Sequence, residues 1–552
     1  MSKGDLPNQK EIIRTRTKHK HLEEHYDEQL DEMLPENHHR GDIVSSNRML
    51  AYSDAVMATC ATFLVLPFRN LKVIEELKRN NSTCNLSRNS TKNSTFNLNE
   101  YYENNILSVY FCHNYTEFIM FFIGFLIVLS IWENMNIRSL VIKRVDDFIL
   151  TLVIFEMLLT SFLPFSLALQ GHYPDQKSSI IITCVVLGIL QIIDIGIVLY
   201  SLHSPKLLHI DLKVWSQSDL QELTLIMVFR PLISFFIVSI GGALCIVHYG
   251  ASWACIGLLT LMPTIRKFYW YMRRRMNKFA KTTKDTFLLH FSKGSVPKER
   301  VEIMSDAAVA IVACIVILDI TVEEFPKKDE VKKEGLNNIL SHMQPEFLTF
   351  LGTFCLVSAL WYINHTVLHL FKTVNSIALY FQKFFLVFGC LCPLAGTMLL
   401  KYATKGNYNS TIAIRFSALI VFFSSLANFF MLLYGLLSKT KFLYDWASWM
   451  HFKTNKQQHF YTLVKTLNIP FWSLICTFGT LGSSKAAPYV LYVTVLAVPC
   501  SFFVSKLILM NHIGKAAVYF THSIIRKLTS KRNKPKRNKN EQMSLDPINH
   551  IS

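Results

Sequence analysis

An arginine and an aspartate six residues apart open an apolar run at two places in this chain. The first run reads RMLAYSDAVMATCATFLVL, from Arg48 to Leu66, and the second reads RVEIMSDAAVAIVACIVIL, from Arg300 to Leu318. These residue types offer ion pairing and hydrogen bonding at the edge of an apolar layer, where a charge is tolerated if it reaches water or a partner. The same unusual pattern used twice predicts the same role for both copies.

The two runs match at seven positions, with an offset of 252 residues. The matched pairs are Arg48/Arg300, Ser53/Ser305, Asp54/Asp306, Ala55/Ala307, Ala58/Ala310, Ala61/Ala313 and Leu66/Leu318. Both arginines can reach the membrane interface, whereas both aspartates lie more than a turn inside and need partners. Those partners come either from neighbouring helices or from the arginine of the same copy. The arginines and aspartates could then clamp helices together, or they could lie at the entrance of a pore, and the pattern agrees with both roles.

One face of each run combines small, mildly polar and aliphatic side chains. Counted from the residue after the aspartate, positions i, i+4, i+7 and i+11 share one side of a helix. They are Ala55, Thr59, Thr62 and Leu66 in the first run, and Ala307, Ile311, Cys314 and Leu318 in the second. This combination suits a narrow, wetted path with a constriction. Small residues also allow close helix packing in lipid, so the stripe alone favours packing and leaves the path as the alternative.

The composition places the chain in a bilayer. Of its 552 residues 51% are apolar and 17% are charged, with a mean hydropathy of +0.27, which is too apolar for an ordinary soluble domain. Apolar runs of about 18 residues or more recur, each long enough to cross about 30 Å of hydrocarbon as a helix. We predict an all-α membrane protein with twelve transmembrane helices. They cover residues 48–68, 114–133, 148–169, 179–202, 223–247, 252–271, 301–322, 346–371, 375–400, 411–437, 459–481 and 487–511.

The repeated motif divides these helices into two halves. Each copy opens a group of six spans, and because six is even, both copies enter the membrane in the same direction. We therefore predict two parallel six-helix repeats about an axis along the membrane normal. The predicted regions are a polar tail at 1–46, a first repeat at 47–275 with a luminal loop at 69–113, a basic linker at 276–299, a second repeat at 300–512 and a basic tail at 513–552.

Sequons and basic flanks predict the orientation. The loop after the first span packs five N-glycosylation sequons, which indicate a luminal face. Their asparagines are Asn80, Asn81, Asn85, Asn89 and Asn93, and Asn114 and Asn409 head further sequons with the same predicted sidedness. Most basic stretches fall on the opposite side, as the positive-inside rule expects, so both termini are predicted to be cytosolic. The net charge of +18 then indicates attraction to anionic membrane lipid rather than to nucleic acid.

Two of the twelve cysteines stand apart from the rest. Cys84 and Cys112 lie in the predicted luminal loop, an oxidising environment, so they are candidates for a disulfide, with two free thiols as the alternative. The other ten lie in apolar runs, where cysteine behaves as a small hydrophobe. No group of histidines, cysteines or carboxylates shows a recognisable ligand spacing, so we expect no metal site and no cofactor.

At the repeated motif the sequence resembles the transmembrane protein 175 family of endosomal and lysosomal potassium channels. That family carries an arginine, three variable residues and Phe-Ser-Asp at the start of the first span of each six-span repeat. Tyr52 and Met304 stand at the phenylalanine position here, while the arginine, serine and aspartate match in both copies. The resemblance extends to the twelve-span layout and the polar N-terminal lead. It implies a homodimer in which four first-type helices surround one central pore.

The resemblance also implies roles for the stripe residues. The family narrows its pore at an isoleucine in the second stripe position, with a threonine one turn further along. Here Thr59 and Ile311 occupy the constriction, or gate, and Thr62 and Cys314 occupy the next layer, which would contribute to selectivity. The other pore-lining residues are then Ala55, Leu66, Ala307 and Leu318. The implied permeant ion is K⁺ in endosomal and lysosomal membranes, with proton permeation left open, because the histidine that some vertebrate members carry after the first span is absent.

Two other classes of function compete with a channel. No HExxH, GxSxG or phosphate-binding loop occurs, so an enzyme is not expected. A secondary transporter is the alternative, since twelve spans in parallel repeats also describe that class. Glu156, Asp194, Arg230 and Lys383 lie in predicted spans, as coupling groups of transporters do. We expect Arg230 to pair with Asp194 or Glu156, because an isolated charge in the membrane costs at least about 2.5 kcal/mol.

Overall fold

The computed structural model describes most of the chain. The described residues are 44–69, 98–204, 206–209, 212, 215–265, 268, 272, 296–318, 321, 325, 326, 328–403, 406–438, 442–447 and 456–510. Most of the two tails and of the basic linker lie outside these ranges, as do Cys84 and the five asparagines of the sequon-rich loop. The predictions made for those segments stay predictions.

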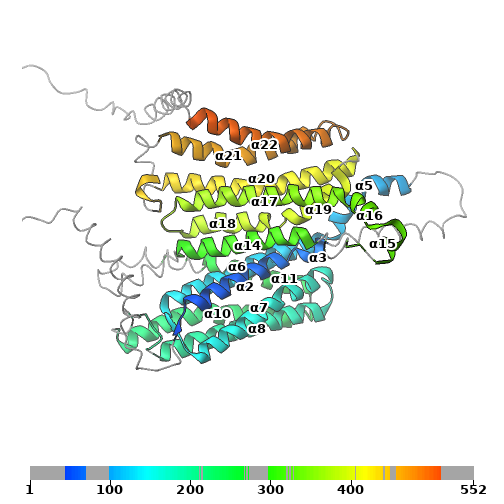
Figure 1. The fold of residues 1–552 in the computed structure, drawn as a ribbon. Helices are drawn as coiled ribbons and strands as arrows, with labels where there is room; N and C mark the ends of the chain where they lie inside the picture. Colours follow the sequence, from blue (N-terminus) through cyan, green and yellow to red (C-terminus); the bar gives the residue numbers. More distant parts are fainter. Residues whose placement is uncertain are drawn as a thin grey trace, which may run out of the picture.

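Each of the twelve predicted spans overlaps a described helix, and the helices run roughly parallel in one bundle (Figure 1). In chain order these helices are α2 (Asn47–Phe63) with α3 (Leu66–Arg69), α6 (Tyr115–Val141), α7 (Asp147–His172), α8 (Lys177–His203), α10 (Gln217–Leu244), α11 (Tyr249–Leu259), α14 (Lys298–Leu318), α17 (Gln344–His369), α18 (Ser376–Gly389) with α19 (Cys392–Tyr402), α20 (Tyr408–Leu437), α21 (Lys456–Gly479) and α22 (Ala487–Met510).

Nine helical segments within the described residues are long and apolar enough to cross a membrane. The other three predicted spans are helical as well, but α2 has 17 residues, α11 has 11 and α21 opens on the polar run KQQH. The coarser part of the fold class is therefore confirmed: the chain is mostly helical, and nine of its described helical segments are able to span a membrane.

Side-chain caps fix where several of these helices begin. Asp146 accepts a hydrogen bond from the Ile149 amide at 3.0 Å at the start of α7, and Asn375 accepts one from the Ala378 amide at 2.9 Å at the start of α18. Such caps satisfy backbone amides that lack a partner inside the helix. The two caps open the third predicted span of each half, so the halves use the same device at the same place.

Short backbone pairings beside the first helix of each half also match. Strand β1 (Val44–Ser45) pairs antiparallel with β2 (Arg144–Val145), with Val44 opposite Val145, just before α2 and α7 begin. In the second half a bridge joins Val296, just before α14, to Val374, just before α18. The residues Val44 and Val296 are separated by the same 252 positions as the two arginines of the motif.

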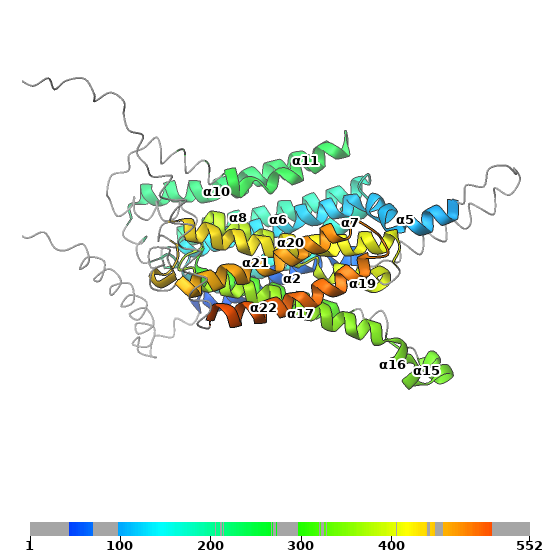
Figure 2. The ribbon, with the colours of Figure 1, turned by 90° about the horizontal axis from the view of Figure 1, so that it is seen from above.

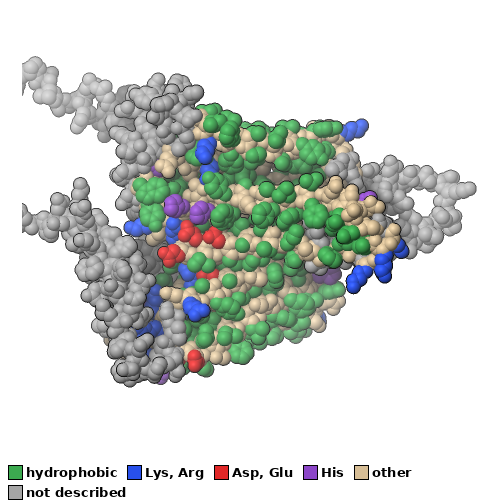
Figure 3. Space-filling model, in the orientation of Figure 1, with side chains coloured by type: hydrophobic (Ala, Val, Ile, Leu, Met, Phe, Trp, Pro, Cys, Tyr) green, Lys and Arg blue, Asp and Glu red, His purple; other side chains and the backbone are tan. Residues whose placement is uncertain are grey.

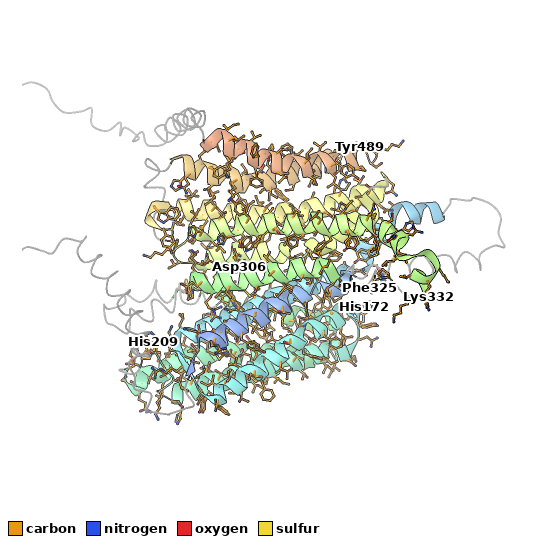
Figure 4. The ribbon with its side chains drawn as sticks, in the orientation of Figure 1. His172, His209, Asp306, Phe325, Lys332 and Tyr489 are labelled. Atoms are coloured by element: carbon orange, nitrogen blue, oxygen red, sulfur yellow. The ribbon has the colours of Figure 1, made fainter. Side chains whose placement is uncertain are left out.

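Three shorter helices extend from one end of the bundle. They are α5 (Leu98–His113), α15 (Lys328–Glu334) and α16 (Leu336–His342) (Figures 1 and 2). His172, Lys332 and Tyr489 lie toward this same end, and His209 lies toward the other (Figure 4). The sequence assigns the first three to the luminal side and His209 to the cytosolic side, so the arrangement of the described helices agrees with the predicted alternation.

The structure corrects three predicted boundaries. The luminal loop 69–113 ends in the helix α5, which is kinked at Asn105. The first span is not one helix, because α2 ends at Phe63 and a turn separates it from α3. The second half begins inside the predicted linker, since α14 starts at Lys298. Capping and turn geometry set these ends, and hydropathy does not report either.

The two halves meet along their first helices. Helices α2 and α14 pack side by side in the middle of the bundle, and smaller contacts join α6 to α18 and α5 to α20 (Figure 1). Hydrophobic side chains cover much of the face in Figure 3, as a lipid-facing surface requires. The fold thus places the two copies of the motif next to each other.

Candidate functional site

Asp54 is the centre of a polar cluster between the two halves. Its side chain is fully buried, and its Oδ1 accepts hydrogen bonds from Arg300 Nη2 at 2.6 Å and from Trp132 Nε1 at 2.8 Å. A buried carboxylate needs such partners because the apolar surroundings do not stabilise its charge. The arginine of the second copy therefore neutralises the aspartate of the first copy, and α6 contributes the tryptophan.

The second copy repeats half of this arrangement. Asp306 Oδ1 accepts a hydrogen bond from Trp361 Nε1 at 2.8 Å, as Asp54 does from Trp132. Asp306 is exposed, however, and no described residue forms an ion pair with it or with Arg48, which is exposed too. Acidic and histidine side chains gather on this face, toward the end at which α14 begins (Figure 3), and Asp306 lies on that helix (Figure 4). The motif thus leaves one arginine and one aspartate of opposite charge on the surface of the chain.

The predicted stripe lies only partly on the open face of α2. Ala55 is exposed and Thr59 is half-buried, but Thr62 is fully buried and its hydroxyl donates to the Thr59 carbonyl at 2.9 Å. Phe63 is exposed in its place, with 41% of its surface accessible. Leu66, half-buried, belongs to α3 rather than to α2, because the helix is broken before it.

On α14 the predicted stripe remains within a single helix. Cys314 is exposed, whereas Ala307, Ile311 and Leu318 are half-buried. The helix runs unbroken from Lys298 to Leu318, so all four stripe positions keep a helical spacing. The two motif helices therefore differ. Helix α2 ends before the last stripe position, whereas α14 includes all four positions and continues to the predicted luminal end.

Behind α14 the second half contains a cluster of uncharged polar side chains. Ser305 Oγ donates to Asn364 Oδ1 at 3.1 Å and accepts from Gln382 Nε2 at 2.6 Å, and Asn364 Nδ2 donates to Asn428 Oδ1 at 2.7 Å. All four side chains are buried. Ser53, the counterpart of Ser305, instead donates to the Met49 carbonyl of its own helix at 2.9 Å. The matched serines therefore have different roles in the two halves.

The first half contains a charged cluster, and it corrects the prediction for Arg230. Glu156 and Asp194 both pair with Arg138, at 2.7 and 2.6 Å. Arg230 instead donates to Asn134 Oδ1 at 2.6 Å and to Ser130 through the hydroxyl at 2.8 Å and the carbonyl at 2.9 Å. The prediction failed because α6 supplies Arg138, which the sequence had placed just beyond the predicted end of the second span.

Two small cavities adjoin this charged cluster. They measure about 20 and about 30 Å³, and Asn134, Asp194 and Arg230 line both. Each has room for a water molecule, which needs roughly 10–15 Å³ and polar partners. Neither cavity is lined by a residue of α2 or α14. The charged cluster is therefore separate from the open faces of the two motif helices.

Lys383, the last of the four residues compared above with coupling groups of transporters, links the two halves. Its Nζ lies 2.7 Å from Oε2 of Glu133 in α6, and both side chains are buried. The sequence marked Lys383 as unusual but gave no partner, since Glu133 falls at the last residue of its predicted span. Glu133 and Lys383 are 250 positions apart in the sequence, so no local sequence pattern indicates that they pair.

The structure also bears on the luminal predictions. Asn114 and Asn409 are buried, and Asn409 Oδ1 accepts from the Leu107 amide at 3.3 Å, so neither has room for a glycan in the folded chain. Cys112 is exposed and forms no disulfide with another described cysteine. Its predicted partner Cys84 lies outside the described residues, so the pairing stays a prediction. Within the described part of the chain no group of three or more His, Cys, Asp or Glu side chains is arranged to hold a metal ion.

A protein-family model covers both motif helices. The model for the endosomal/lysosomal potassium channel TMEM175 matches residues 48–164 and 300–393, which begin at the two motif arginines. This chain is related to the TMEM175 family. The match to TMEM175 therefore includes α2, α6 and α14, which build the cluster around Asp54, and extends into α18, which carries Lys383.

Relatives that match over most of their length agree with the match to the family. The endosomal/lysosomal proton channel TMEM175 of Danio rerio is 25% identical over 510 residues, covering 88% of this chain and 91% of its own length. Those of Gallus gallus and Homo sapiens are each 25% identical and cover 84% of this chain, and 87% and 86% of their own lengths. The crystal structure of a lysosomal potassium-selective channel TMEM175 homolog from Chamaesiphon minutus is 19% identical, with a TM-score of 0.29, over 37% of this chain and 96% of that one.

Proposed function

We propose that the protein is a potassium-selective cation channel of endosomal and lysosomal membranes. The relation to TMEM175 proteins over most of the chain supports this function, and so do nine helical segments able to cross a membrane within the described residues. The relatives' name adds proton permeability, which we propose as a second conductance of the same path. No cofactor is needed for either, since passive conduction uses only the permeant ion, and an enzymatic activity is not part of the proposal.

The proposed architecture has twelve transmembrane helices in two parallel six-helix repeats. Three matched features support the repeats. They are the tryptophan-to-aspartate hydrogen bonds at Asp54 and Asp306, the caps at Asp146 and Asn375, and the backbone pairings at Val44 and Val296. Both termini lie in the cytosol in this arrangement, with the basic flanks near anionic lipid.

The proposed assembly is a homodimer. The support for it is that the motif forms only one of its two possible ion pairs within a single chain. Within one chain α14 donates its arginine to the aspartate of α2 at 2.6 Å. A second copy placed around a two-fold axis repeats the same contact in the order α2, α14, α2, α14. Arg48 of one copy then meets Asp306 of the partner subunit, which neutralises the two charges that the single chain leaves exposed.

The proposed pore runs between the four motif helices. Thr59 and Ile311 form its narrowest ring, which contains two threonines and two isoleucines in the dimer. Apolar rings block ions because a partly dehydrated cation finds no oxygen there, and hydroxyls ease wetting. The selectivity layer beyond it is supported at Cys314, which is exposed, and not at Thr62, which is buried. Ala55, Ala307, Leu66 and Leu318 complete the lining.

A secondary transporter remains the second candidate, because the charged cluster of Arg138, Glu156 and Asp194 lies in the membrane beside cavities with room for water. Patch-clamp recording from enlarged endolysosomes expressing the protein separates the two functions. A channel gives resolved unitary currents that persist under a K⁺ gradient alone. Flux without unitary currents that requires a counter-substrate would identify a carrier and overturn the proposed function.

A further inference from the structure

Seven buried or half-buried polar residues tie four helices into a closed loop, which we call the interhelical circuit. Its members are Arg300 and Ser305 in α14, Asp54 in α2, Trp132 and Glu133 in α6, and Gln382 and Lys383 in α18. Each helix in the circuit bonds to the next, and the last bonds to the first. The circuit surrounds the contact between the two motif helices.

The bonds of the circuit can be followed from α14. Arg300 donates to Asp54 at 2.6 Å, and Trp132 donates to the same carboxylate oxygen at 2.8 Å. The next residue of α6, Glu133, pairs with Lys383 at 2.7 Å. Neighbouring Gln382 donates to Ser305 at 2.6 Å, which returns the circuit to α14.

Adjacent residues make the circuit stiff. Trp132 and Glu133 are consecutive on α6, and Gln382 and Lys383 are consecutive on α18, so neither helix can slide without straining a bond on each side. Direct hydrogen bonds to charged groups in a low-dielectric interior resist such sliding more than apolar contacts do. The relative height of α2 and α14 is thereby fixed by bonds that lie outside both helices as well as by Arg300 and Asp54 within them.

We propose that Glu133 and Lys383 are positioning residues for permeation: they hold α2 and α14 at the height that places Thr59 and Ile311 in one ring. This inference rests on the proposed channel function and adds a determinant of selectivity that lies outside the motif. Neither residue touches the path, because both side chains are buried, in α6 and α18. Their effect on ion selection must pass through the two motif helices.

The test uses the full-length protein and four variants of this pair. Glu133→Gln and Lys383→Met remove one charge each while keeping side-chain length. Glu133→Asp keeps the charge and shortens the side chain by one methylene, so it disturbs the geometry with the least cost to folding. Glu133→Lys with Lys383→Glu exchanges the two charges. The measurements are the amount of folded protein by fluorescence-detected size exclusion and the reversal potential with K⁺ on one side and Na⁺ on the other.

A matched control separates positioning from general stability. Arg415→Met also removes a charged contact between helices, since Arg415 Nη2 of α20 donates to the Thr480 carbonyl, just after α21, at 2.7 Å. Neither residue belongs to a helix of the interhelical circuit. We expect less folded protein for this control and an unchanged reversal potential. For Glu133→Gln, Lys383→Met and Glu133→Asp we expect the reversal potential to shift toward zero, and for the charge exchange a return toward the wild-type value.

Several results would overturn the proposal. One is that Glu133→Asp keeps the wild-type reversal potential, and that Glu133→Gln or Lys383→Met, whichever folds, keeps it too. This result would count even if these variants yield less protein. Another is a charge exchange that restores protein but leaves selectivity as low as in the single variants. Both cases presuppose wild-type currents, whose absence would instead reject the channel function itself.

Discussion

Arg300 of α14 and Asp54 of α2 form a 2.6 Å ion pair between residues 246 positions apart, and the aspartate side chain is fully buried. The pair joins the two copies of one motif, because the first copy supplies the aspartate and the second supplies the arginine. Trp132 of α6 donates to the same oxygen. Asp54 of the first motif and Arg300 of the second are thereby neutralised inside one chain, and Arg48 and Asp306 are left for another contact.

Replacing Arg300 by alanine should destabilise the folded chain strongly. Asp54 would keep only the tryptophan as a partner, and a buried charge left without its counterion costs about 3–5 kcal/mol. The double variant Arg300→Ala with Asp54→Asn should recover part of this loss, because no charge is then stranded. Thermal unfolding of the detergent-solubilised protein measures both effects. Purely additive losses in the two single variants and the double variant would show that the pair does not act as a unit.

Reversing the charge at Arg48 should break the proposed dimer. Arg48→Asp places two acidic side chains together where the partner subunit's Asp306 is expected, and like charges repel there. Combining Arg48→Asp with Asp306→Arg should restore the dimer, which mass photometry in detergent detects. Lys332→Glu is the control, since Lys332 is exposed at the opposite end of the bundle. A dimer that is equally abundant in all variants would place the interface elsewhere.

Glycosylation should be confined to the sequon-rich loop. We expect glycosidase to increase the gel mobility of the wild-type protein, and this shift should disappear when Asn80, Asn81, Asn85, Asn89 and Asn93 are all replaced by glutamine. Asn409→Gln should not change the shift, because Asn409 is buried and bonded to the Leu107 amide at 3.3 Å. A wild-type protein that glycosidase leaves unchanged would argue against the luminal assignment of this loop.

Hydropathy and the repeated motif predict the helices because both depend on local sequence. Each predicted span overlaps a helix, and the offset between Arg48 and Arg300 locates α2 and α14. The break after Phe63 was not predicted, since the apolar run continues through the turn into Pro67. Apolarity measures depth in the membrane and carries little information about where a helix is interrupted.

The partners of the charged residues required the packing. The six-residue spacing in the motif allowed Asp54 to pair with Arg48 as well as with Arg300, and only the contact between α2 and α14 decides in favour of Arg300. Lys383 was recognised as an unusual charge, but its partner Glu133 lies in the other half. Thr62 fits a helical stripe by spacing, yet the packing of α2 buries it. Long-range pairing of this kind follows from the topology rather than from any sequence window.

The central claim is that α2 and α14 line the ion path with Thr59 and Ile311 at its narrowest ring. Thr59→Ile makes the ring fully aliphatic, so it should lower conductance or open probability by favouring dewetting. Ile311→Asn adds polar groups, so it should raise conductance and reduce the preference for K⁺ over Na⁺. The decisive measurement is patch-clamp of enlarged endolysosomes carrying each variant at matched protein levels. Opposite changes in conductance, with the reversal potential of Ile311→Asn moved toward zero, are the predicted result; wild-type conductance and selectivity in both variants would remove this ring from the pore.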